Sequence, residues 1–340
     1  MIRDFGNLSD GRSVKSIRLG SVDGLQAEIL SYGAILRRLS VPTRQGRREL
    51  VVTLPSLASY ELDRAYVGQL LGRCSNRIAG AAFTLQGRQC RLSANDGVNQ
   101  LHGGAGGFGR CLWEVIEAAG SKSVATRVVL GLHSRAGDQG YPGNLQVRAE
   151  FTAGASELEL NLESHCDEAT PLSLTYHPYF NLAGVSGYPV ADMQLRIASS
   201  GYLPVRDSQL IPEGTIAPVA DSPFDFRMPR SVQAPAVSTH AQLAHGAGYD
   251  HCWVLDPARE WDAELHSQHS GIGLQLRSDS PALQFYDGHG LGRDNPGVSG
   301  ICLEPQQYPN AVNEPGFPRA ILQPGQTFRT RIVYRFQDAG

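Results

Sequence analysis

The chain has 340 residues, with 30 Lys and Arg against 33 Asp and Glu, which gives a formal net charge of −3 at pH 7. This balance lacks the basic surplus that is typical of proteins that bind nucleic acid or an anionic membrane surface. Hydrophobic residues make up 41% of the chain and charged residues 19%, so extensive disorder is excluded and a sizeable core is expected.

The N-terminus and the cysteines indicate a cytoplasmic protein. Residues 1–7 lack the apolar stretch of a signal peptide, and no apolar run approaches the ~18 residues of a membrane span. No linker or charge block divides the chain, so we expect residues 1–340 to form one domain. The cysteines are scattered, without a C-x-x-C pair, and we expect free buried thiols. They are Cys74, Cys90, Cys111, Cys166, Cys252 and Cys302.

The first third of the chain predicts short strands and one short helix. Residues 56–62 (Ser-Leu-Ala-Ser-Tyr-Glu-Leu) favour a helix with Ser56 as its N-cap. Helical periodicity is almost absent elsewhere. The strand candidates of this region are centred on Ile17, Ile29, Leu39, Val51 and Leu85.

A glycine-rich stretch, Gly104–Gly109, matches the G-x-G-x-x-G fingerprint of dinucleotide-binding proteins. That motif binds a nucleotide only between a strand and a helix. Here residues 110–115 predict a strand, and the chain shows no βαβ pattern. We therefore interpret the stretch as a loop and expect no nucleotide cofactor.

Strict alternation of apolar and polar residues dominates the remainder of the chain. Residues 145–151 and 158–162 alternate on either side of Gly154 and predict an antiparallel hairpin. Residues 124–132 and 328–336 predict two more long strands. An all-β sandwich or barrel follows. Shorter strand candidates lie around Ile197, Leu274 and Phe285.

Ten histidines raise the question of a metal site. The tightest pair is His266 and His269, but an i, i+3 spacing fits neither a strand face nor a known ligand pattern. We expect this pair to lie in a solvated loop, and we expect no metal.

Six blocks of polar residues carry the candidate chemistry. Singly, each has a structural interpretation: His102 could cap a turn, His177 could be a core histidine and Glu304 a carboxylate at a strand end. The blocks are Gly72–Arg77, ending in Asn76 and Arg77; Asn99–Gly104, with His102; Tyr176–Leu182, with His177 and Tyr179; Tyr249–His251, with Asp250; Gln284–Tyr286; and Leu303–Gln306, with Glu304.

Together these blocks (G-R-x-x-N-R, L-H-G-G, H-P-Y-F-N-L, Y-D-H and L-E-x-Q) resemble the aldose 1-epimerase (galactose mutarotase) family along almost the whole chain. The resemblance implies a large antiparallel β-sandwich and interconversion of the α and β anomers of free hexoses such as glucose or galactose. It implies His177 as general acid, Glu304 as general base and His102 as a second histidine at the sugar. It also implies sugar contacts from Asn76, Arg77, His102, Asp250 and Gln284.

Two positions depart from the family pattern. Many relatives carry Thr where this chain has Pro305, and this change could shift the backbone of the base. Thr is also frequent at the position of Tyr176, where the change could alter the pocket wall.

Ring opening of a hemiacetal explains these residue types. A base takes the C1 hydroxyl proton while an acid protonates the ring oxygen as C1–O5 breaks, so a carboxylate and a histidine suffice without metal or cofactor. An ordinary Glu, with a pKa of about 4.3, is ionised at pH 7, whereas an ordinary His, at about 6.5, is mostly neutral. We therefore expect a neighbouring carboxylate to favour the imidazolium of His177.

The binding side chains also suit a sugar. Arg77 and Asp250 can form charge-assisted hydrogen bonds with vicinal hydroxyls. Tyr179, Phe285 and Tyr286 could cover a sugar face, with core packing an equal alternative for the phenylalanine.

Three other functions remain open at this point. A glycosidase would use Asp250 and Glu304 as its carboxylate pair. A silent carbohydrate-binding protein could keep Arg77 and Asp250 but would have no reason to keep both His177 and Glu304. A hexose-6-phosphate 1-epimerase would need a basic cluster, for which only scattered arginines are available. These arginines are Arg37, Arg38, Arg47 and Arg48.

The partner implied is a small-molecule sugar, with no nucleic acid and no membrane. The sequence does not fix the oligomeric state.

Overall fold

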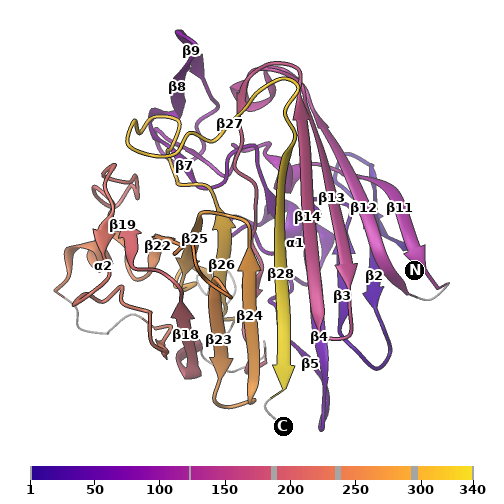
Figure 1. The fold of residues 1–340 in the computed structure, drawn as a ribbon. Helices are drawn as coiled ribbons and strands as arrows, with labels where there is room; N and C mark the ends of the chain where they lie inside the picture. The colour runs from indigo at the N-terminus through magenta and orange to yellow at the C-terminus, as the bar shows by residue number, and fades with distance from the viewer. Residues whose placement is uncertain (1, 122–123, 185–189, 234–238, 292–297, 339–340) are drawn as a thin grey trace.

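The computed structural model describes residues 2–121, 124–184, 190–233, 239–291 and 298–338, and β-strands dominate this part of the chain (Figure 1). Fourteen described strands form the larger sheet. In spatial order they are β21 (Arg230–Ser231), β18 (Met193–Ile197), β23 (Ala263–Ser267), β24 (Ile272–Ser278), β28 (Phe328–Asp338), β14 (Glu157–Cys166), β13 (Leu145–Ala153), β12 (Ala125–Ser134), β2 (Ser13–Gly20), β3 (Gln26–Leu30), β4 (Leu36–Thr43) and β5 (Gly46–Glu49), with β1 (Ile2–Asn7) paired to β2 and β11 (Glu114–Gly120) to β12.

The long strands confirm the sequence prediction. β13 and β14 form an antiparallel hairpin, and β28 pairs with the other side of β14. Leu158, Leu160 and Leu162 point into the core, while the glutamates on the opposite face of β14 pair with arginines of β28, as in Glu163–Arg329 at 3.0 Å. Alternating burial of this kind fixes the strand register, because a shift by one residue would bury the charges.

One pairing differs from the antiparallel expectation. β2 and β12 run parallel where they meet, at the pair Leu19 and Ala125. β1–β5 and β11–β14 each form a meander, and the two meanders meet at this pair. Because no hairpin turn connects β2 to β12, the two strands need not run antiparallel.

A second, six-stranded sheet packs on the larger one. Residues of both sheets, such as Leu303 and Phe285 from the smaller and Leu160 and Tyr334 from the larger, belong to one buried apolar cluster, which confirms the sandwich. The strands, in spatial order, are β17 (Tyr179–Phe180), β26 (Ile301–Gln306), β25 (Ala282–Tyr286), β22 (Asp250–Val254), β19 (Gly201–Leu203) and β20 (Ala217–Pro218).

Short pairs of strands complete the described sheets. They are β6 (Leu70–Leu71) with β16 (Thr175–Tyr176), β7 (Arg77–Ile78) with β10 (Gln100–Leu101), β8 (Ala82–Leu85) with β9 (Arg88–Arg91), and β15 (Thr170–Pro171) with β27 (Ile321–Leu322).

The described residues contain two short α-helices, α1 (Leu57–Leu62) and α2 (Ala241–Gly246). The predicted helix is α1, and the Ser56 side chain caps it by accepting a hydrogen bond from the backbone of Ser59. Helix α2 was not predicted, since its six residues show no apolar periodicity. No helix in the described part of the chain is long and apolar enough to span a membrane.

Three local predictions need comment. Val51 does not lie in a strand but forms an isolated bridge to Phe180. The predicted loop for the histidine pair is wrong for His266, which is an exposed residue of β23, and right for His269, which lies in the following turn. All six cysteines are free thiols, although Cys111 and Cys166 are only partly buried.

Candidate active site

A polar pocket of about 180 Å³ opens at the side of the smaller sheet that faces away from the core. All eight residues singled out from the sequence line this pocket, although they come from six separate stretches of the chain. They are Asn76, Arg77, His102, His177, Tyr179, Asp250, Gln284 and Glu304.

Strand alternation explains how the smaller sheet presents its polar residues. In β25 and β26, Leu283, Phe285 and Leu303 face the core, so Gln284 and Glu304 face the pocket. These two polar residues are direct cross-strand partners. Phe285 is therefore a core residue and does not cover a sugar face.

Asp250 lies next to this pair. It begins β22, opposite Tyr286 of β25, which also lines the pocket. Gln284 Nε2 donates a hydrogen bond of 2.6 Å to Asp250 Oδ1. Burial raises the pKa of Asp250, and Arg77 opposes this shift.

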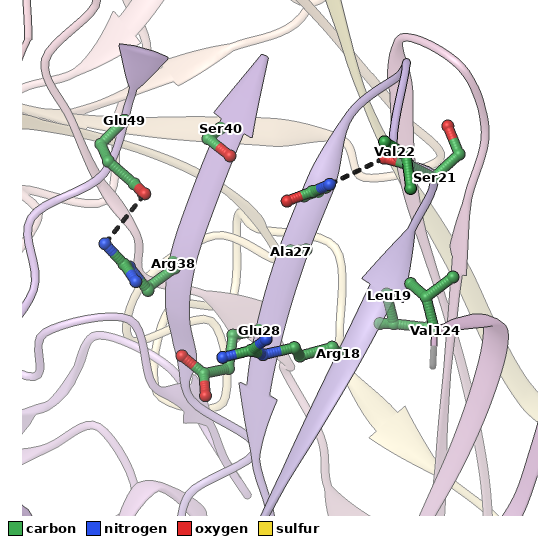
Figure 2. Close-up of a pocket in the computed structure, with 11 residues that line it drawn as sticks. Arg18, Leu19, Ser21, Val22, Ala27, Glu28, Arg38, Ser40, Glu49 and Val124 are labelled. Carbon is green, nitrogen blue, oxygen red and sulfur yellow. Dashed lines mark hydrogen bonds and ion pairs between the residues drawn. The ribbon is translucent and has the colours of Figure 1, made fainter. Parts of the chain in front are cut away.

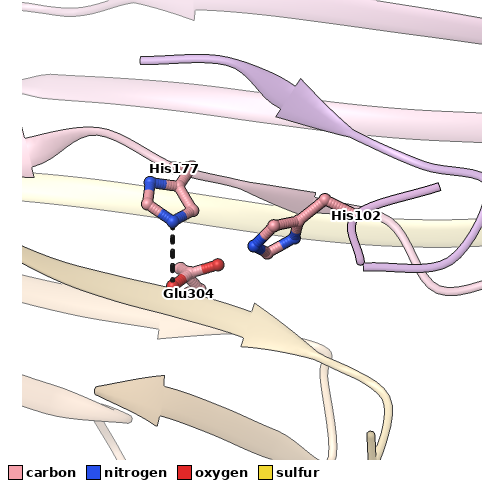
Figure 3. A group of neighbouring side chains, drawn as sticks. All are labelled: His102, His177 and Glu304. Carbon is pink, nitrogen blue, oxygen red and sulfur yellow. Dashed lines mark ion pairs between the residues drawn. The ribbon is translucent and has the colours of Figure 1, made fainter. Parts of the chain in front are cut away.

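His177 and Glu304 form the centre of the site. His177 Nε2 is 3.5 Å from Glu304 Oε1, and the two side chains are only 5% and 3% exposed (Figure 3). Cys302 lies two residues before Glu304 on the same face of β26, and its Sγ is 3.4 Å from His177 Nδ1. β26 thus contacts both ring nitrogens. Among the described atoms, Glu304 Oε2 is buried without a hydrogen-bond partner.

The protonation of this pair differs from the sequence-based expectation. Burial lowers the pKa of His177 to about 4 and favours the neutral ring, so the prediction that a nearby carboxylate favours its imidazolium is wrong. Burial raises the pKa of Glu304 well above its ordinary value, and the negative charge of Asp250 adds to this effect. Both shifts favour the uncharged forms of the two side chains.

His102 is held as a neutral hydrogen-bond donor. Its Nδ1 accepts a hydrogen bond of 3.1 Å from the backbone N–H of Asn76, so the remaining proton of the neutral ring lies on Nε2. Burial lowers the pKa of this ring well below its ordinary value. The loop after it needs glycine, because a Cβ on Gly103 would lie 1.8 Å from the carbonyl oxygen of Gly72.

The spacing of His102, His177 and Glu304 raises the possibility of a metal ligand set, because one donor atom of each lies within 4.8 Å of the others. The tautomer of His102 opposes it. A metal needs a free lone pair on the ring, and His102 Nδ1 already accepts a hydrogen bond while Nε2 carries the proton. The arrangement instead suits proton transfer and hydrogen bonding.

Tyr179 lines the pocket beside His177. The ring lies 5.1 Å from the ring of His177, and the hydroxyl donates to the carbonyl of Ala65 at 2.9 Å. Sequence reasoning did not single out Tyr66 or Arg64, which also line the pocket. Tyr66 packs edge-on against His102 at 4.6 Å between ring centres. Neither lies in one of the six polar blocks, so short motifs could not reveal them.

A larger hollow, of about 270 Å³, lies over β2–β5 of the larger sheet (Figure 2). Its carboxylates already have partners. Glu49 pairs with Arg38 at 3.1 Å, and Glu28 pairs with Arg37 at 2.6 Å and accepts from Ser16. The carboxylates of this hollow are thus paired, whereas Glu304 in the polar pocket has a buried oxygen without a described hydrogen-bond partner, which makes the polar pocket the candidate active site.

The fold and the pocket together define an acid–base enzyme for a small polyhydroxylated substrate. The family model for "Aldose 1-epimerase" matches residues 15–335. A galactose mutarotase of Sus scrofa is 37% identical over 98% of both chains, and an aldose 1-epimerase of Escherichia coli is 30% identical over 96% of both. The crystal structure of a galactose 1-epimerase from Lactobacillus acidophilus superposes with a TM-score of 0.86 at 26% identity, covering 100% of this chain and 99% of that one.

The chain therefore belongs to the aldose 1-epimerase family and is an isomerase.

Proposed function

We propose that the pocket interconverts the α and β anomers of a free hexose such as glucose or galactose, with Glu304 as general base and His177 as general acid. The observation that carries these roles is the buried pair itself, with Nε2 and Oε1 3.5 Å apart and Oε2 of Glu304 unpartnered among the described atoms. The C1 hydroxyl of a sugar would supply the missing hydrogen bond.

The reaction needs one proton on the pair. When this proton lies on His177, Glu304 is an ionised base and His177 a protonated acid, and no proton has to be taken up from solvent. Glu304 then takes the C1 hydroxyl proton, the C1–O5 bond breaks to leave an aldehyde, and His177 protonates O5. Rotation about C1–C2 exposes the other face of the aldehyde, and the reverse transfers close the ring as the other anomer.

The remaining side chains bind and orient the sugar in this proposal. Arg77 carries a positive charge that opposes the raised pKa values of both Asp250 and Glu304, so it stabilises the ionised base. His102 donates from Nε2, and Asp250 accepts from sugar hydroxyls. Asn76 and Gln284 complete the binding set, and Tyr179 and Tyr286 line the wall.

The charges at the pocket favour a neutral sugar over a phosphorylated one. Of the two arginines that line the pocket, Arg77 is already paired with Asp96 and Arg64 lies in the same lining as Asp250, so the described lining holds no cluster of basic side chains for a phosphate dianion. The scattered arginines considered from the sequence do not line the pocket as described. Arg37 and Arg38 pair with glutamates, and Arg47 and Arg48 donate to backbone carbonyls.

Polarimetry provides the test. The protein should accelerate the change in optical rotation of freshly dissolved α-D-glucose or α-D-galactose. A folded protein that binds a hexose without accelerating mutarotation would instead support the binding-protein alternative. Accelerated mutarotation of glucose 6-phosphate, with none of glucose, would support the phosphorylated substrate.

The wider setting is part of the same proposal. We infer a cytoplasmic location, supported by the six free thiols. We infer a small-molecule sugar as the partner. The net charge of −3 supports the absence of a nucleic-acid or membrane partner. We also infer one domain for residues 1–340, supported by a larger sheet that includes strands from β1 to β28.

A further inference from the structure

The turn at residues 95–99 lies directly before β10 and forms hydrogen bonds with several residues that line the pocket. Within the turn, the backbone N–H groups of Asn95 and Asp96 both donate to the carbonyl of Asn99. Gly97 takes a positive φ of 59°, which this tight reversal requires. These bonds make the turn a defined structure rather than a loose connection.

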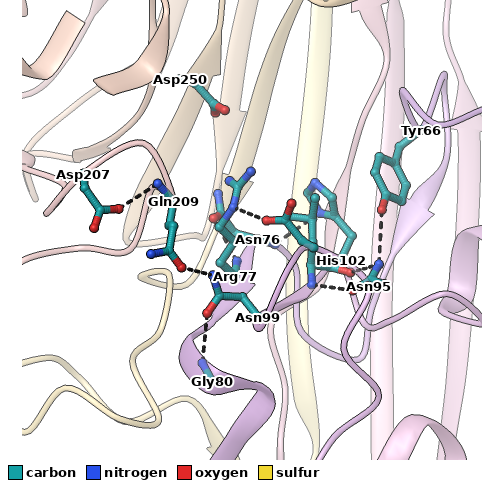
Figure 4. A network of polar contacts seen from close by, with 12 residues as sticks. Tyr66, Asn76, Arg77, Gly80, Asn95, Asn99, His102, Asp207, Gln209 and Asp250 are labelled. Atoms are coloured by element: carbon teal, nitrogen blue, oxygen red, sulfur yellow. Dashed lines mark hydrogen bonds and ion pairs between the residues drawn. The ribbon is translucent and has the colours of Figure 1, made fainter. Parts of the chain in front are cut away.

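The side chain of Asn95 fixes the turn to the site. Its Oδ1 accepts from the backbone N–H of Leu101 at 2.8 Å, and its Nδ2 donates to the carbonyl of Leu101 at 3.0 Å and to the hydroxyl of Tyr66 at 3.4 Å (Figure 4). Leu101 precedes His102 and pairs with Arg77 across the β7–β10 ladder. These contacts therefore fix the position of the turn relative to Arg77 and His102, which line the pocket.

The next side chain, Asp96, contacts Arg77. Arg77 Nε donates to Asp96 Oδ2 at 2.8 Å, with the arginine side chain 14% and the aspartate 36% exposed. Arg77 lines the pocket, whereas Asp96 is not among its lining residues. A guanidinium group has five N–H donors, so an Nε contact leaves the four on its terminal nitrogens for sugar hydroxyls.

We propose that Asp96 is a positioning residue for sugar binding, which acts by fixing the guanidinium group of Arg77. The inference rests on the proposed role of Arg77 in binding the sugar. An arginine side chain that rotates freely loses conformational entropy when it binds a ligand. The contact with Asp96 already restricts Arg77 in the free protein, so less entropy is lost when the sugar binds. The same contact partly neutralises the arginine, which keeps its charge compatible with a neutral substrate.

The test is a kinetic comparison of Asp96→Asn and Arg77→Ala. Asparagine keeps the shape of the aspartate but removes its charge, so KM should rise about three- to tenfold while kcat stays within about twofold. Because Asp96 acts through Arg77, the double variant should match Arg77→Ala alone within about twofold. The variant Asp96→Glu, which restores the charge, should recover part of the affinity.

A matched control is Glu264→Gln. Glu264 makes an ion pair of 2.8 Å with Arg196 and is 35% exposed, close to the values for Asp96, but it lies on β23 away from the pocket. This variant should keep the wild-type KM. An Asp96→Asn variant with wild-type KM, or effects that multiply in the double variant, would overturn the proposal.

Sugar affinity measured by NMR titration separates this inference from the proposed function. If the wild type binds hexose but does not accelerate mutarotation, the catalytic roles fail, and the dissociation constants of the same variants still test Asp96. If Arg77→Ala leaves both KM and the dissociation constant unchanged, Arg77 does not bind the sugar and the role of Asp96 falls with it.

Discussion

Replacing Glu304 by glutamine removes a proton acceptor from the pocket while keeping the size of the side chain. Glu304 is 2% exposed, and burial raises its pKa, which favours the uncharged carboxyl group, so glutamine is a close match in shape and charge. We therefore expect the fold of the variant to be as stable as that of the wild type to within about 1 kcal/mol.

The catalytic loss should be large in comparison. General acid–base catalysis contributes ~10²–10⁴-fold, which corresponds to about 3–5 kcal/mol of activation free energy, and kcat should fall by this factor. KM should change little, because the amide can still contact the C1 hydroxyl. His177→Asn should cause a similar fall, and the two losses should not multiply, since both side chains take part in one coupled transfer.

The measurement is the initial rate of change in optical rotation, corrected for the spontaneous reaction, with folding checked by circular dichroism. A folded Glu304→Gln variant that keeps more than about a tenth of the wild-type kcat would show that Glu304 is not the base. Asp250 would then be the next candidate, because it is the other pocket carboxylate whose pKa burial raises.

Three further predictions use the same preparations. Arg77→Ala should raise KM about 10- to 150-fold, the loss expected for a hydrogen bond to a charged group, and an unchanged kcat/KM in a folded variant would contradict a binding role. Activity should survive EDTA treatment and gel filtration, and loss on chelation with recovery on adding a divalent ion would refute the metal-free mechanism. Burial and the nearby His240 and His245 lower the pKa of His251 to about 3, below its unfolded value of about 6.5, so its contribution to stability is lost as pH falls below 6.5. In urea unfolding, the free energy of unfolding should fall from pH 7 to pH 5 by about 2 kcal/mol less in His251→Gln than in the wild type. An equal fall in both proteins would contradict this role of His251.

The sequence predicts most of the fold, because the long strands bury one face only. The leucines of β14 alternate with charged residues that pair on the outer face, and this contrast is visible without coordinates. The smaller sheet carries no such signal. Both faces of β26 are buried, one in the core and one in the pocket, so Glu304 stands in a strand whose six residues are all inaccessible.

The site shows a similar division. Short motifs identify side chains of the pocket, but they carry no information on the environment that sets a pKa. The low pKa of His177 arises from complete burial, which depends on residues distant in the sequence. Tyr66 and Asp96 escape motif reasoning for the same reason, since their importance comes from contacts with His102 and Arg77.

The pocket residues come from two kinds of structure, sheet strands and turns, and these differ in how well they tolerate an insertion. Glu304, the base in our proposal, lies with Gln284 and Asp250 on hydrogen-bonded neighbouring strands of one sheet, where an insertion would disturb the adjacent strands. Arg77 and His102 are presented by a short ladder and the turns around it, in a stretch that can lengthen at the exposed β8–β9 hairpin without altering the sheet. If Arg77 and His102 bind the sugar as proposed, changes in these turns can alter substrate preference without disturbing the strand that carries Glu304.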